Sequence, residues 1–221
     1  MEADYWMQRW REGRTGWHQE RPTPLMCRHW PKLGIERGSR VFVPLAGRSQ
    51  DMAWFASQGL RVLGVELSEL AITGFFVGHG LTPKTTVSRY GTHHEAAGIE
   101  LICGDAFALD AEALAGCDAA FDRAAMIALP PSLRERYVDT VYGCLPRRCR
   151  GLLITLEYPK DEKAGPPFAV DEAEVRARLA PWGEVETLER RDILAGQPSF
   201  QAEGVTRLET VVYRVERRAG L

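Results

Sequence analysis

Short, nearly continuous apolar runs alternate along the chain with segments in which apolar residues recur at helical spacing. The first run, Arg40 to Leu45, is typical of a strand buried on both faces. Runs of the same kind occupy residues 61–67, 99–103, 119–122 and 151–156. Helices are expected over residues 50–58, from Ser68 to Gly78 or Gly80, from Pro130 to Leu145, and over residues 170–179. Strands that alternate with helices predict a parallel, doubly wound sheet.

The C-terminal part of the chain completes this prediction. The helix that follows Pro130 is the most clearly amphipathic one. Its polar side consists of Arg134, Glu135, Arg136 and Asp139. Two late apolar runs, residues 185–191 and 208–215, have no helix between them and are expected to pair as an antiparallel hairpin. The predicted fold class is α/β: a Rossmann-like, doubly wound, mostly parallel sheet of seven strands with an antiparallel C-terminal hairpin.

The start of the chain is unusually aromatic, with four of the six tryptophans among the first thirty residues. Ala3, Trp6, Met7 and Trp10 share one face of an expected helix. Such a helix packs its apolar stripe against the core, or covers a bound planar ligand as a lid, and the two interpretations are compatible. The length of 221 residues suits a single domain with residues 1–30 as an N-terminal extension or lid.

Charge and hydropathy argue against two classes of partner. Lys and Arg number 28 and Asp and Glu number 30, giving a net charge of −2 with the signs interspersed. Nucleic acid is therefore not an expected partner, because binding to a phosphate backbone depends on clustered cations. No membrane association is expected either, since no apolar run approaches the roughly 18 residues of a span. The N-terminus also lacks the features of a secretory signal, which favours a cytoplasmic location.

Cysteine and histidine usage points to reduced thiols and no metal. The five cysteines are odd in number and show no CxxC pairing, which argues against a disulfide framework. No set of cysteines and histidines has the spacing of a zinc site. His93 and His94 lie close to Gly91 and Gly98, so this segment is interpreted as a polar surface turn.

Candidate chemistry gathers at the ends of the first two strands. In a doubly wound sheet, ligands bind outside the carboxyl ends of the strands. Gly47 follows the first strand and lets the backbone approach a ligand, and the next helix directs its N-terminus at the same place. Glu66 ends the second strand, nineteen residues later, where an acidic side chain accepts hydrogen bonds from a ribose diol. Each signal has an ordinary alternative: a simple turn for the glycine and a surface acid for the glutamate.

The signatures of phosphate binding are missing from the same loop. A dinucleotide-binding turn has the pattern G-x-G-x-x-G, whereas here a single glycine precedes Arg48-Ser49-Gln50-Asp51, and no Walker lysine follows. A nucleoside with a carboxylate and no phosphate fits better, and S-adenosylmethionine is the common ligand of that description. Its methyl group is already activated, so a protein has chiefly to hold a nucleophile in line and exclude water.

Several strings resemble a known family, in the same order and spacing, from about residue 5 to residue 215. They are Val41-Phe-Val-Pro-Leu-Ala-Gly-Arg48, Val65-Glu-Leu-Ser-Glu69, Phe121-Asp-Arg-Ala-Ala125, Gly165-Pro-Pro-Phe168, Trp6-Met-Gln-Arg-Trp10 and Trp17-His-Gln19. The family is the bacterial branch of the thiopurine S-methyltransferases, which are class I S-adenosylmethionine-dependent enzymes. The family usually has P-L-C-G-K where this chain has Pro44-Leu-Ala-Gly-Arg48. The departures are therefore Ala46 in place of the cysteine and Arg48 in place of the lysine. Because Arg48 keeps the charge, cofactor binding should survive, and the departure bears more on the acceptor.

The resemblance implies a set of site residues. Those implied to contact the cofactor are Trp10, Leu45, Glu66 and Arg123, in addition to Gly47 from the strand pattern. Those implied to border the adenine are Asp105 and Ala106. Those implied to form the acceptor pocket are Trp17, Pro166, Pro167 and Phe168. For Arg123, the alternative is a salt bridge to Glu66 or Asp122.

The predicted activity is transfer of the methyl group of S-adenosylmethionine to the sulfur of a small aromatic or heterocyclic thiol. The products are S-adenosyl-L-homocysteine and a thioether. His18 and Asp122 are candidates for assisting proton removal, although heteroaromatic thiols ionise readily and need no strong base. The alternatives are a methyltransferase for natural-product thiols or for selenium and tellurium compounds, and a non-catalytic nucleoside-binding module. A small-molecule thiol is the expected partner, and a monomer is the expected state.

Overall fold

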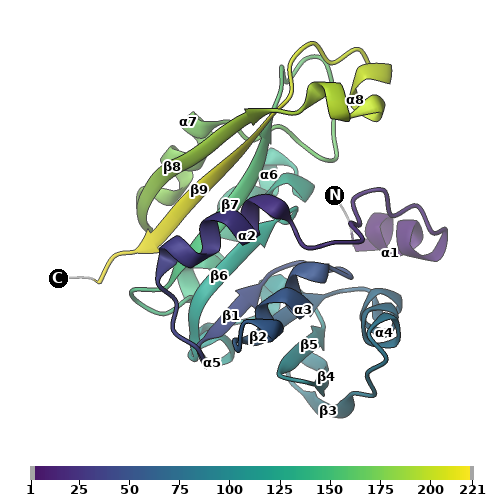
Figure 1. Ribbon diagram of the computed structural model, residues 1–221, viewed down its shortest axis with the longest axis vertical. Helices are drawn as coiled ribbons and strands as arrows, with labels where there is room; N and C mark the ends of the chain where they lie inside the picture. The colour runs from purple at the N-terminus through teal and green to yellow at the C-terminus, as the bar shows by residue number, and fades with distance from the viewer. Residues whose placement is uncertain (1–2, 220–221) are drawn as a thin grey trace.

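A single mixed sheet of nine strands organises the computed structural model, which describes residues 3–219. The strand order is β3-β4-β5-β2-β1-β6-β7-β9-β8, and Figure 1 shows the sheet running along the molecule. The five central strands, from β5 to β7, are parallel, and the pairs at both edges are antiparallel. The strands are β1 Arg40–Val43, β2 Arg61–Glu66, β3 Lys84–Ser88, β4 Gly91–Ala96, β5 Ile99–Cys103, β6 Cys117–Arg123, β7 Arg150–Glu157, β8 Gly183–Asp192 and β9 Glu209–Arg217. Residues 1, 2, 220 and 221 of the predicted domain lie outside the described residues.

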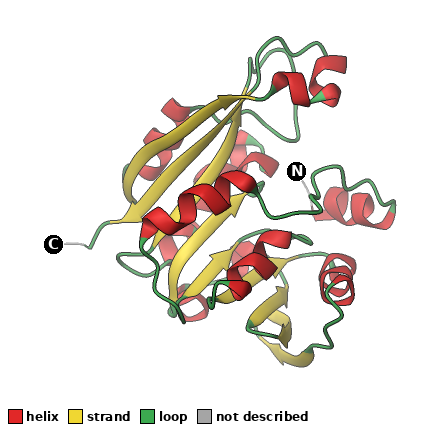
Figure 2. Cartoon of the chain, viewed as in Figure 1, coloured by secondary structure: helices red, strands yellow, loops and turns green. Residues whose placement is uncertain are grey.

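Helices cover both faces of the sheet, as Figure 2 shows. One apolar cluster joins the sheet to α2 (Pro24–His29), α3 (Gln50–Ser57) and α4 (Glu69–Gly78). A second joins the opposite face to α5 (Ala111–Leu114), α6 (Pro131–Thr140) and α7 (Glu172–Leu179). The strand β1 contributes Val41 and Val43 to the first cluster and Phe42 to the second. Its nearly continuous apolar sequence is explained by this burial on both faces.

The predicted α/β class, the parallel core and the C-terminal hairpin are confirmed, but the predicted count of seven strands is wrong. The two additional strands are β3 and β4, which pair with each other and then with β5 at the edge of the sheet. Every residue of β3 is exposed, so this strand has no apolar alternation that the sequence could reveal.

The interpretation of His93 and His94 as a surface turn is wrong, because the segment that contains them is one of these two additional strands. Both residues lie within β4, opposite Thr86 and Thr85 of β3. His94 is buried, and the imidazole Nδ1 of His93 lies 2.6 Å from a carboxylate oxygen of Glu100. Polar side chains that contact one another can thus belong to a strand near the sheet edge that has no apolar pattern.

One residue of α6 lies on the side opposite to the expected one. Arg134 was expected on the polar face together with Glu135 and Arg136, yet its side chain is completely buried, whereas the other two are exposed. Its guanidinium donates a hydrogen bond to the carbonyl of Leu129 and two to the carboxylate of Glu174. A charge at a buried position needs such partners, and helical spacing alone does not reveal them.

The expected N-terminal helix is present as α1 (Ala3–Arg11), which lies against α4 at the end of the molecule where the parallel strands terminate. A short helix that the sequence analysis did not anticipate, α8 (Pro198–Ala202), lies between β8 and β9 at the same end (Figure 1). Within residues 3–219, no helix combines the length and hydropathy needed to cross a bilayer. The same residues include no cluster of three or more metal-ligating side chains.

Candidate active site

A cavity of about 750 Å³ lies at the carboxyl ends of the central strands, between α1 on one side and the segment containing α8 on the other. This volume falls within the range typical of small-molecule sites. The sequence-predicted residues that line it are Trp10, Trp17, His18, Leu45, Gly47, Glu66, Arg123, Pro166 and Pro167. The predicted residues that are not part of its lining are Asp105, Ala106, Asp122 and Phe168.

The turn after β1 is shaped by two residues in the left-handed region. Leu45 has a φ of 46° and Gly47 a φ of 54°. A non-glycine residue in this region is strained, and such strain is concentrated at functional sites. A Cβ on Gly47 would lie 3.5 Å from the indole of Trp10, so the α1 helix approaches this turn closely. The local backbone therefore brings a bare peptide unit to the cavity wall.

The carboxylate of Glu66 ties this turn to the end of β2. One oxygen accepts a hydrogen bond from the N–H of Gly47 at 2.9 Å, and the other accepts from the N–H of Ser68 at 2.8 Å. Burial raises the pKa of Glu66, and the hydrogen bonds from Ser68, Gly47 and Leu67 oppose that effect. Each oxygen retains a lone pair, so the group can accept further hydrogen bonds from a ligand.

Arg123, at the end of β6, brings positive charge to the same cavity. Among the described residues its guanidinium has no hydrogen-bond or ion-pair partner, so the predicted alternative of a salt bridge to Glu66 or Asp122 is wrong. Burial lowers the pKa of Arg123, and the charge of Asp51 opposes that effect. The next residue, Ala124, has a φ of 68° and is a second strained position at a strand end. An unpaired guanidinium in a cavity favours binding of a carboxylate.

Three tryptophans of the N-terminal segment form an aromatic wall. The ring centroid of Trp17 lies 5.2 Å from that of Trp6 and 5.7 Å from that of Trp10, in edge-to-face contacts. The guanidinium carbon of Arg9 lies 5.3 Å from the centre of the Trp17 ring. All four side chains line the cavity and are half-buried or exposed, so α1 covers the cavity and does not enter the core.

The two candidate proton acceptors lie in different places. His18 is half-buried and lines the cavity next to Trp17. Burial lowers the pKa of His18, the positive charges of Arg48 and Arg123 lower it further, and Glu20 opposes them. A lowered pKa favours the neutral imidazole, which is the form that can accept a proton.

Asp122 is directed into the opposite core. Its carboxylate accepts hydrogen bonds from the N–H of Met126 at 3.1 Å and from the hydroxyls of Tyr137 and Tyr142 at 2.9 and 3.0 Å. Burial raises the pKa of Asp122, and these hydrogen bonds oppose that effect. Because Asp122 is buried and does not line the cavity, it cannot take a proton from a ligand there.

The other three predicted residues outside the lining have local roles. The exposed Asp105 accepts a hydrogen bond from the N–H of Phe107 at 2.9 Å and caps a short 3-10 turn. Ala106 is buried in the apolar cluster of the second face. Phe168 lies behind Pro166 and Pro167, where its ring faces the guanidinium of Arg134.

Sequence reasoning missed the residues that enclose the far end of the cavity. Lys163 and Glu203 form an ion pair at 2.6 Å across the opening, and the Lys163 ammonium lies 5.4 Å from the centre of the Phe200 ring. Phe200 and Leu208 belong to a small apolar cluster that joins the loop after β7 to the segment around α8. The only sequence signal was the Pro-Ser-Phe string that begins at Pro198, which is too short to predict a helix.

Comparison with known proteins decides which family this geometry belongs to. The family model described as thiopurine S-methyltransferase matches residues 1–218. The chain belongs to the thiopurine S-methyltransferase family. A relative of that name from Bordetella parapertussis is 55% identical over 217 residues, which cover 98% of this chain and 99% of the relative. Another, from Nitrosomonas eutropha, is 55% identical over 219 residues, or 99% of this chain and 100% of the relative.

Solved structures share the fold of this thiopurine S-methyltransferase family member. A 1,6-didemethyltoxoflavin-N1-methyltransferase from Burkholderia thailandensis, with S-adenosylhomocysteine bound, superposes with a TM-score of 0.65 at 18% identity, covering 97% of this chain and 86% of that one. The YcgJ protein of Bacillus subtilis gives 0.63 at 12% identity, with coverages of 88% and 98%. The family uses S-adenosylmethionine, so the predicted cofactor is confirmed.

Proposed function

We propose that this chain transfers the methyl group of S-adenosylmethionine to the sulfur of a small aromatic or heterocyclic thiol of the thiopurine type. The products are S-adenosyl-L-homocysteine and a thioether. The observation that carries the proposal is the cavity at the strand ends, which combines the carboxylate of Glu66 with aromatic and proline walls. The names of relatives that are 55% identical support the acceptor class.

The groups around Glu66 fit the cofactor, which supplies an activated methyl group when bound. The free lone pairs of Glu66 are suited to the two ribose hydroxyls. Gly47 lets the ligand approach the backbone, and Leu45 and Trp10 enclose it. The unpaired guanidinium of Arg123 binds the cofactor's carboxylate.

Asp105 and Ala106 remain our prediction for the border of the adenine. They follow β5, and the N–H of the preceding Gly104 donates a hydrogen bond of 3.0 Å to the carbonyl of Glu66. This contact supports the proposal, because it keeps the segment next to the ribose end of the site. Replacement of Asp105 by Ala should therefore weaken adenosine binding more than it weakens methionine binding. Equal effects on the two fragments would count against the assignment.

The acceptor occupies the other end of the cavity in this proposal. Trp17 forms one wall, Pro166 and Pro167 form another, and Phe168 supports the prolines from behind. Rigid apolar surfaces of this kind orient a flat ring and exclude water from the reacting sulfur. Because the acceptor sulfur must be in line with the methyl group, the positions of these walls affect the rate.

His18 is the proposed acceptor of the thiol proton. The proton passes from the sulfur to the neutral imidazole and then to solvent, and the thiolate sulfur forms the new bond to carbon as the donor's bond to that carbon breaks. Replacement of His18 by Gln should lower kcat/KM for thiols whose pKa lies above the assay pH and leave unchanged the rate for thiols that are already ionised. An equal loss for both classes would indicate a structural role.

A radiolabelled methyl assay tests the proposed function as a whole. The acceptors should include 6-mercaptopurine, thiophenol and a set of natural-product thiols, with selenite and tellurite in parallel. We expect methyl transfer to 6-mercaptopurine and thiophenol, with a higher kcat/KM for these two than for any other acceptor tested. If methyl transfer occurs only to selenium or tellurium, the acceptor assignment is wrong. If cofactor binds but no acceptor is methylated, the binding-module alternative is supported.

We also propose that the enzyme is a cytoplasmic monomer that binds no nucleic acid. All five cysteines are free, and free thiols persist in a reducing compartment. The predicted mass of a monomer is 24.7 kDa. Light scattering after gel filtration at several concentrations checks this state, and a dimer at micromolar concentration would contradict it.

A further inference from the structure

The buried residue Arg134 contacts both segments that form the proline side of the cavity. Its Nε donates a hydrogen bond of 3.0 Å to the carbonyl of Leu129. Leu129 directly follows Ile127 and Ala128, which line the cavity. The guanidinium carbon also lies 5.8 Å from the centre of the Phe168 ring, within the range of a cation–π contact. One side chain is therefore in contact with two separate parts of the acceptor wall.

The ring of Phe168 determines the shape of the proline turn. Gly165 has a φ of 77°, and a Cβ there would lie 2.5 Å from the Phe168 ring. The ring thus lies between the bare backbone of Gly165 and the guanidinium of Arg134. The N–H of Phe168 donates a hydrogen bond of 2.7 Å to the carbonyl of Ile127, which joins the two wall segments directly. Pro166 and Pro167 are presented to the cavity by this arrangement.

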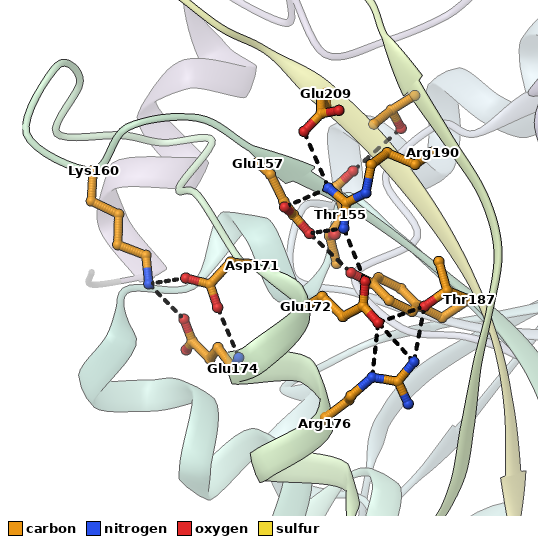
Figure 3. A network of polar contacts seen from close by, with 12 residues as sticks. Thr155, Glu157, Lys160, Asp171, Glu172, Glu174, Arg176, Thr187, Arg190 and Glu209 are labelled. Atoms are coloured by element: carbon orange, nitrogen blue, oxygen red, sulfur yellow. Dashed lines mark hydrogen bonds and ion pairs between the residues drawn. The ribbon is translucent and has the colours of Figure 1, made fainter.

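The guanidinium is held in turn by α7. Its Nη1 lies 2.8 and 2.9 Å from the two carboxylate oxygens of Glu174. Glu174 also pairs with Arg178 at 2.8 Å. Lys160, which belongs to the same loop as the prolines, lies 3.6 Å from Glu174 (Figure 3). Because Arg134 is fully buried, these carboxylate and carbonyl partners compensate for the hydration that its side chain loses.

We propose that Arg134 is a positioning residue for the acceptor: it holds the wall of Ile127 and the wall of Pro166 and Pro167 at the separation that aligns the acceptor sulfur with the methyl group. The inference rests on the proposed function. Arg134 is not part of the cavity lining, so it acts through the residues that are. Lysine cannot replace it, because one ammonium cannot provide two fixed nitrogens that donate separately to the Leu129 carbonyl and the Glu174 carboxylate, and it has no flat face for Phe168.

The test compares Arg134→Lys and Arg134→Met with matched variants of Arg136, which lies exposed on the same helix and contacts Phe107 instead. For each folded variant, the Kd for S-adenosylmethionine and the kcat and KM for 6-mercaptopurine are measured. Both Arg134 variants should lose at least tenfold in kcat/KM for the acceptor while the cofactor Kd stays within twofold. The Arg136 variants should match the wild type. Unchanged acceptor kinetics, or equal losses in cofactor and acceptor binding, would overturn the proposal.

Variants of Phe168 keep the proposal testable if the Arg134 variants do not fold. Phe168→Leu removes the ring face and should reproduce the acceptor-specific loss, whereas Phe168→Tyr keeps the ring face and should lose several-fold less in acceptor kcat/KM. Identical kinetics for these two variants would contradict the proposal. The wild-type enzyme separates the two levels of inference: a wild type that methylates no thiol refutes the proposed function, whereas an active wild type with equally active variants refutes only the role of Arg134.

Discussion

The two ends of the cavity are built by different means. At the cofactor end, the ligand-facing groups lie in turns that directly follow buried parallel strands, and backbone hydrogen bonds to Glu66 fix their geometry. At the acceptor end, they lie in two long loops joined by side-chain contacts, such as the hydrogen bonds from Thr206 to Glu162 and the ion pair of Lys163 with Glu203. In the proposed assignment, the sheet determines the cofactor site, whereas loop contacts determine the acceptor site and can change with the acceptor.

A network of ion pairs and hydrogen bonds connects β7, β8, β9 and α7, next to the loops of the acceptor end. Arg190 of β8 pairs with Glu157, Glu172 and Glu209, which belong to β7, α7 and β9, as Figure 3 shows. Glu157 also accepts a hydrogen bond of 3.1 Å from the hydroxyl of Tyr213. These contacts connect the strands from which both acceptor loops arise. No equivalent side-chain network is needed at the cofactor end, where the strands pair in parallel.

The largest expected effect is the loss of stability when Asp122 is replaced, because this buried strand-end carboxylate, unlike Glu66, points away from the cavity. Asp122→Ala leaves one N–H and two tyrosine hydroxyls without their acceptor in the core, so the free energy of unfolding should fall by about 3 kcal/mol. Urea denaturation measures this change. Asp118→Ala is the control, because Asp118 is exposed on the same strand and accepts a hydrogen bond from the N–H of Arg40. Equal stabilities of the two variants would show that Asp122 is not a structural residue.

Substitutions of two glycines, one at each end of the cavity, should have effects of intermediate size. Gly47→Ala and Gly165→Ala each place a Cβ at a positive φ, which costs about 1–2 kcal/mol of stability. The first should raise the Kd for S-adenosylmethionine and leave the acceptor KM unchanged. The second should raise the acceptor KM and leave the cofactor Kd unchanged, because it displaces the Phe168 ring. Isothermal titration measures the cofactor Kd and initial rates measure the acceptor KM. If Gly47→Ala changed mainly the acceptor KM, or Gly165→Ala mainly the cofactor Kd, the two ends would not be independent.

The smallest effect is expected for the ion pair at the rim of the acceptor end. Glu203 is half-exposed, so Lys163→Met should change acceptor kcat/KM by less than about threefold. The difference from wild type should shrink further in 0.5 M salt, because screening weakens the pair. Lys84→Met, on the exposed edge strand, serves as the control. A tenfold loss would mean that Lys163 contacts the acceptor directly.

The sequence was sufficient to predict those parts of the fold whose patterns are local. Apolar runs predicted the parallel strands, and the positions of Glu66 and Gly47 at strand ends predicted that the two residues belong to one site, where the structure places both. The hydrogen bond between them was not predicted. The prediction failed where partners are distant in sequence. The strands β3 and β4 are stabilised by polar pairing at an edge, and Arg134 is buried because Glu174 lies forty residues further along the chain. No spacing rule within one helix or strand contains that information.

The candidate site shows the same division. Glu66 and Gly47 lie at the ends of predicted strands and were found by position, and Leu45 was named from the family resemblance. Lys163, Glu203 and Phe200 come from loops that only tertiary contacts bring together. Asp122 illustrates the opposite error. It ends a strand next to Arg123, but successive side chains of a strand point to opposite faces, so only Arg123 reaches the cavity.

We propose that Glu66 holds the ribose of the cofactor between the turns after β1 and β2. The most direct measurement is isothermal titration of S-adenosyl-L-homocysteine into the wild type, Glu66→Ala and the control Glu69→Ala, whose carboxylate lies exposed three residues further on. We expect the wild type and the control to bind with a micromolar to submillimolar Kd. Glu66→Ala should lose about 1–3 kcal/mol of binding free energy, which raises the Kd roughly 5- to 150-fold. An unchanged Kd in a folded Glu66→Ala protein would contradict this role of Glu66.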